Sequence, residues 1–253
     1  MTTAKLDAFF RGILDIEGFS SVDPSMNGLQ VDNDGAELAK IAFAVDASLE
    51  TFKRAARAGA GLLFVHHGLY WGSPLPIVGY FRKRLQFLLE NNIALYASHL
   101  PLDQHPSLGN NMALADMLGM ESPEPFGEYR GRLVGYKGRL KKPLTVQEAA
   151  RLIAYENQPP LGLYPFGKAE SETCAVIAGG ASEEALQAIS AGVDIYVTGE
   201  SSHQIYHDIL EAGINMIAGG HYATETWGMR KFMEHCAALL EEEVEFIDAP
   251  TGL

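Results

Sequence analysis

Residues 44–68 read AVDASLETFKRAARAGAGLLFVHHG, and residues 177–201 read IAGGASEEALQAISAGVDIYVTGES. In both stretches an apolar strand leads through Ala-Ser into a helix, which ends at Ala-Gly before a second apolar strand and a polar loop. A further helix and strand follow each stretch. Strands that alternate with helices are typical of a mostly parallel sheet covered on both faces. The sequence therefore predicts an α/β protein with a three-layer α/β/α architecture.

The spacing of apolar residues predicts further strands and helices along the chain. Ser48 is the expected N-cap of the helix at 49–58. Strands are expected at 40–47, 61–65, 93–98, 133–139, 173–178, 193–198, 214–218 and 244–247, and helices at 49–58, 80–91, 111–118, 146–155, 182–191, 203–212 and 223–240. The segment from Ser122 to Gly138 is rich in Pro, Gly and charge, which favours a linker. The similarity of the two quoted stretches indicates an internal duplication, although any two βα units share much of this pattern of apolar and turn-forming residues.

We expect two α/β domains. The first is 1–121 plus 221–253 and carries most of the candidate ligands, and the second is 122–220. The return of the C-terminal segment to the first domain follows because His221 and Glu225 must meet His66 if they share a site.

Composition excludes several functional classes. The chain has 253 residues, 47% of them hydrophobic, and a net charge of −13, which disfavours direct binding to nucleic-acid phosphates. No stretch approaches the roughly 20 apolar residues of a membrane-spanning helix, and the N-terminus does not resemble a signal peptide. Cys174 and Cys236 are far apart in the sequence, which favours unpaired thiols over a lone disulfide. We therefore expect a cytoplasmic protein.

Histidines and carboxylates follow three apolar strands, where ligands gather in parallel α/β sheets. His66 and His67 end the first, His99 and Asp103 follow the second, and His221 and Glu225 follow the third. Imidazole and carboxylate together suit Zn, Mn, Fe, Co or Ni, and the ligand set does not select among them.

Each pair also has a structural interpretation. His66 and His67 would point to opposite sides of an extended strand, so they bind two ions only if they splay at the turn into Gly68. Pro101 excludes a helix interior between His99 and Asp103, and Asp103 alone would suit a helix cap. Because His221 and Glu225 are four residues apart, they share a helix face, which also allows a simple intrahelical contact.

Three such pairs at three strand ends favour metal binding over three unrelated structural roles. A pair of ions would lie about 3.5–4 Å apart and would activate a water for hydrolysis. Asp103 and Glu225 are candidates to bridge the ions, and His99 is either a ligand or a partner that orients one. Glu225, Glu200 and His203 are the candidate catalytic groups, the last two for proton transfer.

At these residues the sequence resembles the Nif-three-like proteins, which are often labelled GTP cyclohydrolase 1 type 2 homologues. The matching motifs occur in the expected order over nearly the whole chain: Asn27–Gln30 (NGLQ), Val65–Gly68 (VHHG), His99–Asn111 (HLPLDQHPSLGNN), Thr198–Glu200 (TGE) and Gly220–Glu225 (GHYATE). The chain is too short for the domain inserted in longer relatives and resembles the compact form.

The resemblance implies a dinuclear site of two divalent metal ions per chain. Its ligands would be His66, His67, Asp103, His221 and Glu225, with His99 close by. It also implies two interlocked domains and a homohexameric ring.

Two functional hypotheses follow. The first is a metal-dependent hydrolase of C–N bonds that acts on a small molecule or a nucleotide such as GTP. The second is a non-catalytic metal chaperone or a regulatory scaffold protein. Turnover that depends on Glu225 would support the first, and transfer of exchangeable metal without turnover would support the second.

Overall fold

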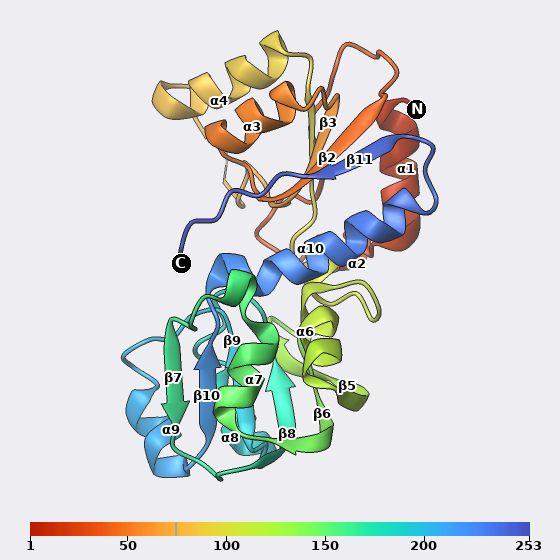
Figure 1. The fold of residues 1–253 in the computed structure, drawn as a ribbon. Helices are drawn as coiled ribbons and strands as arrows, with labels where there is room; N and C mark the ends of the chain where they lie inside the picture. Colours follow the sequence, from red (N-terminus) through yellow and green to blue (C-terminus); the bar gives the residue numbers. More distant parts are fainter. Residues whose placement is uncertain (74) are drawn as a thin grey trace. The chain divides into compact units, whose positions relative to one another are not determined.

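The computed structural model describes residues 1–73 and 75–253, which divide into two compact units (Figure 1). Unit 1 consists of Met1–His105 and Met229–Ala249, and unit 2 consists of Pro106–Gly228 and Pro250–Leu253. The chain therefore passes from unit 2 back into unit 1 within helix α10 (His221–Ala237).

These boundaries differ from the sequence-based ones, because 106–121 and 221–228 pack with unit 2. The side-chain amide of Asn111 donates to the backbone oxygen of Val134 and accepts from the backbone N–H of Ala178. The indole of Trp227 donates to the backbone oxygen of Ile153. Both segments are thus fixed to unit 2 by buried or partly buried hydrogen bonds that a linear sequence does not reveal.

Unit 1 is built on a five-stranded sheet with the order β1-β4-β3-β2-β11, in which all neighbours are parallel except β1 and β4. Its strands are β1 (Gly28–Val31), β2 (Lys40–Asp46), β3 (Leu62–His67), β4 (Ala94–Ala97) and β11 (Glu243–Phe246). Its helices are α1 (Thr3–Ile13), α2 (Ile16–Phe19), α3 (Leu49–Arg57), α4 (Gly79–Glu90) and α5 (Leu100–Asp103), joined by the C-terminal part of α10.

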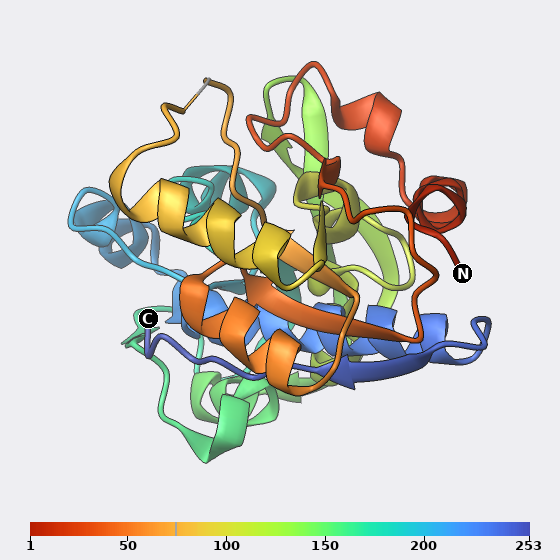
Figure 2. The same cartoon turned by 90° about the horizontal axis from the view of Figure 1, so that it is seen from above.

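Alternation along β3 builds a helical layer on each side of this sheet. The ring of Phe64 lies 4.9 Å from that of Phe10 on α1 and 5.0 Å from that of Phe232 on α10. Its neighbour Leu63 belongs to a different buried cluster with Phe52 of α3 and Leu88 of α4. Because successive strand residues face opposite sides, α1 and α10 cover one face and α3 and α4 cover the other. Figure 2 shows α3 and α4 side by side, and the predicted three-layer α/β architecture is confirmed in this unit.

Unit 2 contains a six-stranded sheet with the order β5-β6-β8-β9-β10-β7, in which β8, β9 and β10 are parallel. Its strands are β5 (Met120–Tyr129), β6 (Arg132–Leu144), β7 (Gly162–Pro165), β8 (Ser171–Val176), β9 (Ile195–Thr198) and β10 (Asn215–Ala218). Its helices are α6 (Asn110–Leu118), α7 (Val146–Ile153), η1 (Tyr155–Asn157), α8 (Ala185–Ala191) and α9 (Tyr206–Ala212). Val176 and Val197 of the sheet share a core with Leu114 of α6 and Ala149 of α7.

The linker predicted from Ser122 to Gly138 is wrong, because that segment forms most of the β5–β6 hairpin. Arg130 and Gly131 join the strands with φ of 50° and 82°, the backbone signature of a tight hairpin turn. The prolines of β5 are tolerated because β5 is an edge strand, and its register is irregular between Glu121 and Glu124. Turn-forming residues thus marked a hairpin and an irregular edge rather than a domain boundary.

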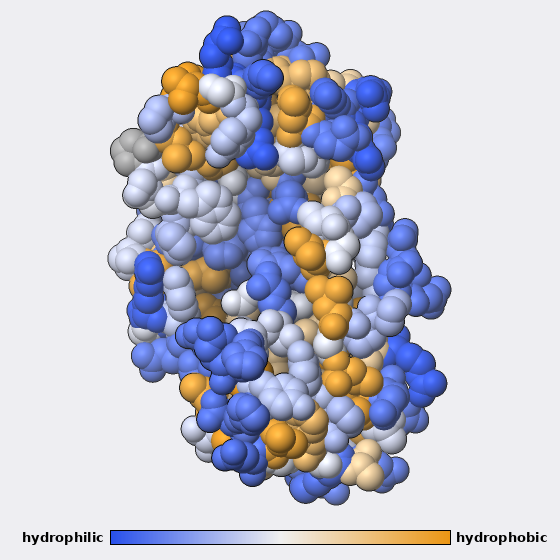
Figure 3. All heavy atoms as spheres, turned by 90° about the vertical axis from the view of Figure 1, so that its left-hand side faces the viewer, coloured by the Kyte–Doolittle hydropathy of each residue, from blue (hydrophilic) through white to orange (hydrophobic). Residues whose placement is uncertain are grey.

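The surface contains both hydrophilic and hydrophobic side chains (Figure 3). On the face that Figure 3 shows, small hydrophobic patches are interrupted by hydrophilic side chains. Within 1–73 and 75–253, no helix combines the length and the apolar character needed to cross a membrane.

Candidate metal centre

His66 and His67 are the last two residues of β3, at the carboxyl edge of the unit 1 sheet. The Nδ1–H group of the fully buried His66 donates to the backbone oxygen of Ser98 at 2.9 Å, and that of His67 donates to Oδ1 of Asp46 at 2.9 Å. Ser98 follows β4 and Asp46 ends β2, so the two imidazoles are held by opposite neighbours of β3. Their ring centroids lie 4.7 Å apart although the residues are consecutive in a strand.

Gly68, which follows these histidines, leaves room for the side chain of Gln30 on β1. A Cβ atom on Gly68 would lie 2.3 Å from the amide of Gln30 and 2.7 Å from Cβ of Ala97. The same Gln30 amide accepts from the backbone N–H of Leu69 at 2.7 Å. The NGLQ motif therefore fixes the backbone next to the histidines.

Asp103 lies beside His66, with its Oδ1 atom 3.5 Å from Nε2 of the imidazole. Pro101 does not exclude a helix here, contrary to the sequence-based expectation, because Leu100–Asp103 forms the short helix α5 with His99 at its N-cap position. Pro101 lies in the first turn, where its missing N–H has no helical partner to lose. One helical turn therefore brings Asp103, which is only 7% exposed, to the histidines.

His99 is oriented by two residues that precede β1. Its Nδ1–H donates to Oδ1 of Asp23 at 2.9 Å, and its backbone N–H donates to Oδ1 of Asn27 at 2.8 Å. Burial raises the pKa of Asp23, but hydrogen bonds from His99, Asn27 and the Ser25 backbone outweigh it, and the pKa falls below its ordinary value. Asp23 is therefore a carboxylate that holds the His99 ring in one orientation.

Together these contacts gather three imidazoles in unit 1. Possible ligand atoms of His66, His67 and His99 lie within 4.8 Å of one another, a separation that suits a divalent cation.

Unit 2 presents its own pair on the first turn of α10. Nε2 of His221 lies 3.1 Å from Oε1 of Glu225, which is 2% exposed. The Nδ1–H group of His221 donates to Oε1 of Glu200 at 2.5 Å. The i,i+4 spacing predicted from the sequence is thus present, on a helix that begins two residues earlier than expected.

Two glycines and a threonine shape the space around this pair. Gly179 has φ of 69°, and a Cβ atom there would lie 2.3 Å from Oε1 of Glu225 and 3.1 Å from Nε2 of His221. Its backbone N–H donates to Oγ1 of Thr224, which in turn donates to the backbone oxygen of Gly220. The loop after β8 therefore approaches the two ligands as closely as a residue without a side chain allows.

The candidate ligands share one hydrogen-bond arrangement, which is found at His66, His67, His99 and His221. In each, the Nδ1–H group donates to an oxygen acceptor, so Nε2 is the ring nitrogen that can bind a metal. Acceptors of this kind orient metal-binding imidazoles and raise their basicity. The donor set, imidazoles beside the buried carboxylates Asp103 and Glu225, fits a divalent metal ion.

Sequence reasoning missed Asp23 and Asp46. Asp46 ends an apolar strand next to the histidine strand, a position that is itself a signal in parallel sheets, whereas nothing local distinguishes Asp23.

The candidate catalytic groups of unit 2 differ in their surroundings. Glu200 accepts from the His221 imidazole, and its half-exposed side chain can exchange protons with solvent. His203 is exposed in the turn before α9, and its proton-transfer role stays a prediction.

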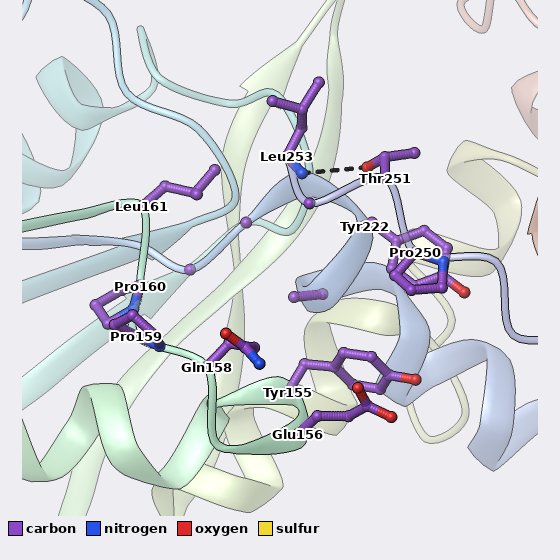
Figure 4. Close-up of a pocket in the computed structure, with 14 residues that line it drawn as sticks. Tyr155, Glu156, Gln158, Pro159, Pro160, Leu161, Tyr222, Pro250, Thr251 and Leu253 are labelled. Atoms are coloured by element: carbon purple, nitrogen blue, oxygen red, sulfur yellow. Dashed lines mark hydrogen bonds between the residues drawn. The ribbon is translucent and has the colours of Figure 1, made fainter.

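Unit 2 also has a pocket of about 640 Å³ beside the start of α10. Tyr155 and Tyr222 form its aromatic side, and the segment Pro159–Leu161 and the tail Pro250–Leu253 form further walls (Figure 4). Gly220 and Tyr222, which flank His221 in the sequence, both line it. The pocket therefore adjoins the backbone that positions His221.

Comparison with known proteins agrees with this architecture. The model of the Duf34/NIF3 (NGG1p interacting factor 3) family matches residues 1–251. Two curated relatives, from Treponema pallidum (strain Nichols) and Archaeoglobus fulgidus, are each 40% identical over the whole of both chains, and both are named GTP cyclohydrolase 1 type 2 homolog.

Solved structures give the same result. A protein from Thermus thermophilus matches with a TM-score of 0.89 and 36% identity, and protein ybgI, described as of unknown function, matches with 0.91 and 35%. Each comparison covers all of both chains. This α/β chain with its candidate metal ligands belongs to the Duf34/NIF3 family, as the sequence motifs predicted. Its relatives include the proteins named GTP cyclohydrolase 1 type 2 homolog.

Proposed function

We propose that this protein binds two divalent metal ions and uses them to hydrolyse a C–N bond in a small molecule or nucleotide. The ligands in this proposal are His66, His67 and Asp103 of unit 1 and His221 and Glu225 of unit 2, with His99 beside them. The observation that supports it best is the oxygen acceptor on Nδ1 of every histidine in the set. A hydrogen bond from Nδ1–H to an oxygen atom is typical of histidines that bind a metal through Nε2, and here it occurs at four imidazoles.

The carboxylates supply the negative charge that such a site requires. Asp103 and Glu225 are both almost completely buried, and burial of a carboxylate is unfavourable unless it is paired with a cation or hydrogen-bonded. Two closely spaced divalent ions, when bound, polarise water and a substrate oxygen or nitrogen for hydrolysis. Zn, Mn, Fe, Co and Ni all suit this donor set.

The remaining roles belong to residues of unit 2. Glu200 holds the His221 imidazole through its Nδ1–H group, and in this proposal its exposed carboxylate also accepts a proton from substrate or water. Glu225 combines a ligand role with that of general base, and His203 is the second proton-transfer candidate. The names of the curated relatives make GTP the first substrate to test.

The test compares wild-type protein with the variant Glu225→Gln, each loaded with Zn, Mn, Fe, Co or Ni in turn. Formation of hydrolysed product from GTP and from a panel of cyclic amidines and amides would be followed by mass spectrometry, and metal content would be measured in parallel. The proposal predicts turnover by the wild type and its loss in Glu225→Gln, which keeps at least part of its metal. Ions that pass to an apo-acceptor protein without turnover of any substrate would contradict the hydrolase and favour a metal chaperone.

We also propose that the chain assembles into a homo-oligomer, with a hexamer as the expected state. Large apolar side chains are exposed close together on one segment of unit 1, including Ile77 at 62%, Val78 at 66% and Tyr80 at 71%. Exposed apolar clusters of this kind are typical of interaction surfaces. Multi-angle light scattering would measure the mass, and a monomer at micromolar concentration would contradict the proposal.

A further inference from the structure

Trp71 lies four residues after His67, in the segment between β3 and α4. Its ring centroid is 5.1 Å from that of His99, with an interplanar angle of 74°, and 5.9 Å from that of His67, with an angle of 44°. The indole therefore packs against two of the three imidazoles gathered in unit 1.

The position of this indole is fixed by hydrogen bonds as well as by ring contacts. Its Nε1–H group donates to the backbone oxygen of Gly68 at 3.1 Å. Its backbone forms an antiparallel bridge with Ser25, whose own N–H donates to Oδ1 of Asp23. Since Asp23 also orients His99, the same short segment holds both the indole and an imidazole.

Despite these contacts, Trp71 is 39% exposed. A large aromatic side chain that only supports its neighbours gains most when it is fully buried. The other tryptophan of the chain, Trp227, is partly buried, and its indole donates to the backbone oxygen of Ile153 and packs against Tyr155. Trp71 instead combines a fixed orientation with an exposed side chain beside a cluster of candidate metal ligands, a combination that suits a residue that binds a ligand.

We infer that Trp71 binds the substrate, by stacking on a planar heteroaromatic ring and holding it beside His67 and His99. This inference rests on the proposed function and names the class of substrate that the site would take. An indole face binds either aromatic rings or cations. Bound divalent ions next to the imidazoles would repel a cationic group, so an uncharged heteroaromatic ring is the matching partner.

The test uses intrinsic fluorescence, because the chain has two tryptophans. Trp227→Phe leaves Trp71 as the only indole, and Trp71→Phe leaves Trp227 as the matched control. Co²⁺ is titrated first, since an ion bound at His67 and His99 would quench Trp71. GTP is then added to the zinc-loaded protein, and inorganic tripolyphosphate, which carries similar charge without a ring, is added to a parallel sample.

The expected result is quenching of Trp71 by Co²⁺ and by GTP but not by tripolyphosphate, with no response of Trp227 to GTP. Calorimetry should show GTP binding weakened by about ten-fold or more in Trp71→Ala, in line with base–aromatic stacking elsewhere, with unchanged metal content and partial recovery in Trp71→Phe.

Three results would overturn the inference while leaving the metal site in place. They are quenching by Co²⁺ without any effect of GTP, equal quenching by tripolyphosphate, and GTP affinity that is unchanged in Trp71→Ala. Loss of metal from Trp71→Ala would show that the indole only supports the imidazoles. Absence of Co²⁺ quenching would instead count against the metal site itself.

Discussion

The two units share the topology of four strands and differ in the rest of their sheets. In unit 1, β2, β3 and β4 are adjacent and parallel, and β1 adds an antiparallel strand to β4. In unit 2, β8, β9 and β10 repeat that arrangement, and β7 adds an antiparallel strand to β10. This correspondence supports the internal duplication indicated by the two quoted stretches of sequence.

The units differ in the residues at the carboxyl end of the middle strand. In unit 1, β3 ends in the imidazoles His66 and His67, and Asp46 at the end of β2 orients one of them. In unit 2, β9 is followed by Gly199 and Glu200, and Glu200 orients the imidazole of His221. The end of β8 contributes only Gly179, whose missing side chain makes room for Glu225. The same scaffold thus places candidate ligands or an orienting carboxylate at the end of the middle strand, and an orienting carboxylate or a glycine at the end of the strand before it.

The largest effect is expected in the aromatic core of unit 1. Phe64 contacts Phe10, Tyr96 and Phe232 there. Phe64→Ala should lower the free energy of unfolding by about 3–5 kcal/mol, measured by urea denaturation, because it leaves a cavity among rings that cannot collapse. The matched variant is Leu89→Ala on α4, which is 65% exposed and should change that free energy by less than about 0.5 kcal/mol. Similar values for both variants would mean that the aromatic cluster does not anchor the unit.

The next effect concerns the groups that orient the imidazoles in both units. Asp46→Ala and Glu200→Ala should each weaken metal binding by about 10–100-fold, measured by competition with a chelator. Ser98→Ala serves as control, because His66 donates to the backbone oxygen of Ser98, which this substitution retains. Loss of affinity in Ser98→Ala, or none in the two carboxylate variants, would refute the orienting role.

A substitution at Gly179 tests whether its missing side chain makes room for the carboxylate of Glu225. Gly179→Ala should displace the carboxylate and reduce metal binding, and its φ of 69° adds strain of about 1–2 kcal/mol to the folded state. Gly192→Ala has nearly the same φ, 67°, but no atom within 4 Å of the new Cβ. It should lose similar stability and keep its metal. Equal metal content in the two variants would show that Gly179 serves only the backbone turn.

The smallest effect concerns the start of the middle strand, where unit 1 has Gly61 and unit 2 has Asp194. Burial raises the pKa of Asp194, but the ion pair with Lys168 and the N–H groups of Glu172 and Thr173 outweigh it, so the pKa falls below its ordinary value. This stabilisation is complete above the unfolded-state pKa and is lost as pH falls through the lower folded-state pKa. Asp194→Asn should therefore be less stable than wild type by about 1 kcal/mol at pH 7 and equally stable near pH 2. A difference that persists at pH 2 would point to packing instead.

Much of this fold was predictable because its signals are local. Apolar runs and helix caps placed β2, α3, β3, β8, β9 and β10 within a few residues. Ser48 accepts from the backbone N–H of Thr51, as an N-cap residue should. The β5–β6 hairpin was missed because its prolines and glycines are turn formers whose pairing depends on a distant neighbour, β8. The return of 221–228 to unit 2 was missed for a related reason, since it depends on the contacts of Trp227.

The candidate site was likewise predictable where its signals are local and not where they depend on distant contacts. Residue types at strand ends identified the histidines, Asp103 and Glu225, because topology alone brings such ends to one edge of a sheet. The orienting carboxylate Asp23 was not predictable, since it reaches His99 from 76 positions earlier in the chain.

The most direct test of the account is whether the ligands of the two units bind the same ions. Metal content would be measured by inductively coupled plasma mass spectrometry for untagged wild type, His66→Ala, His221→Ala and the double variant. A shared dinuclear site predicts about two ions per wild-type chain. It also predicts that either single substitution weakens both ions and that the double variant loses little more. A His221→Ala protein that keeps one ion at wild-type affinity, with losses that simply add in the double variant, would contradict a shared dinuclear site.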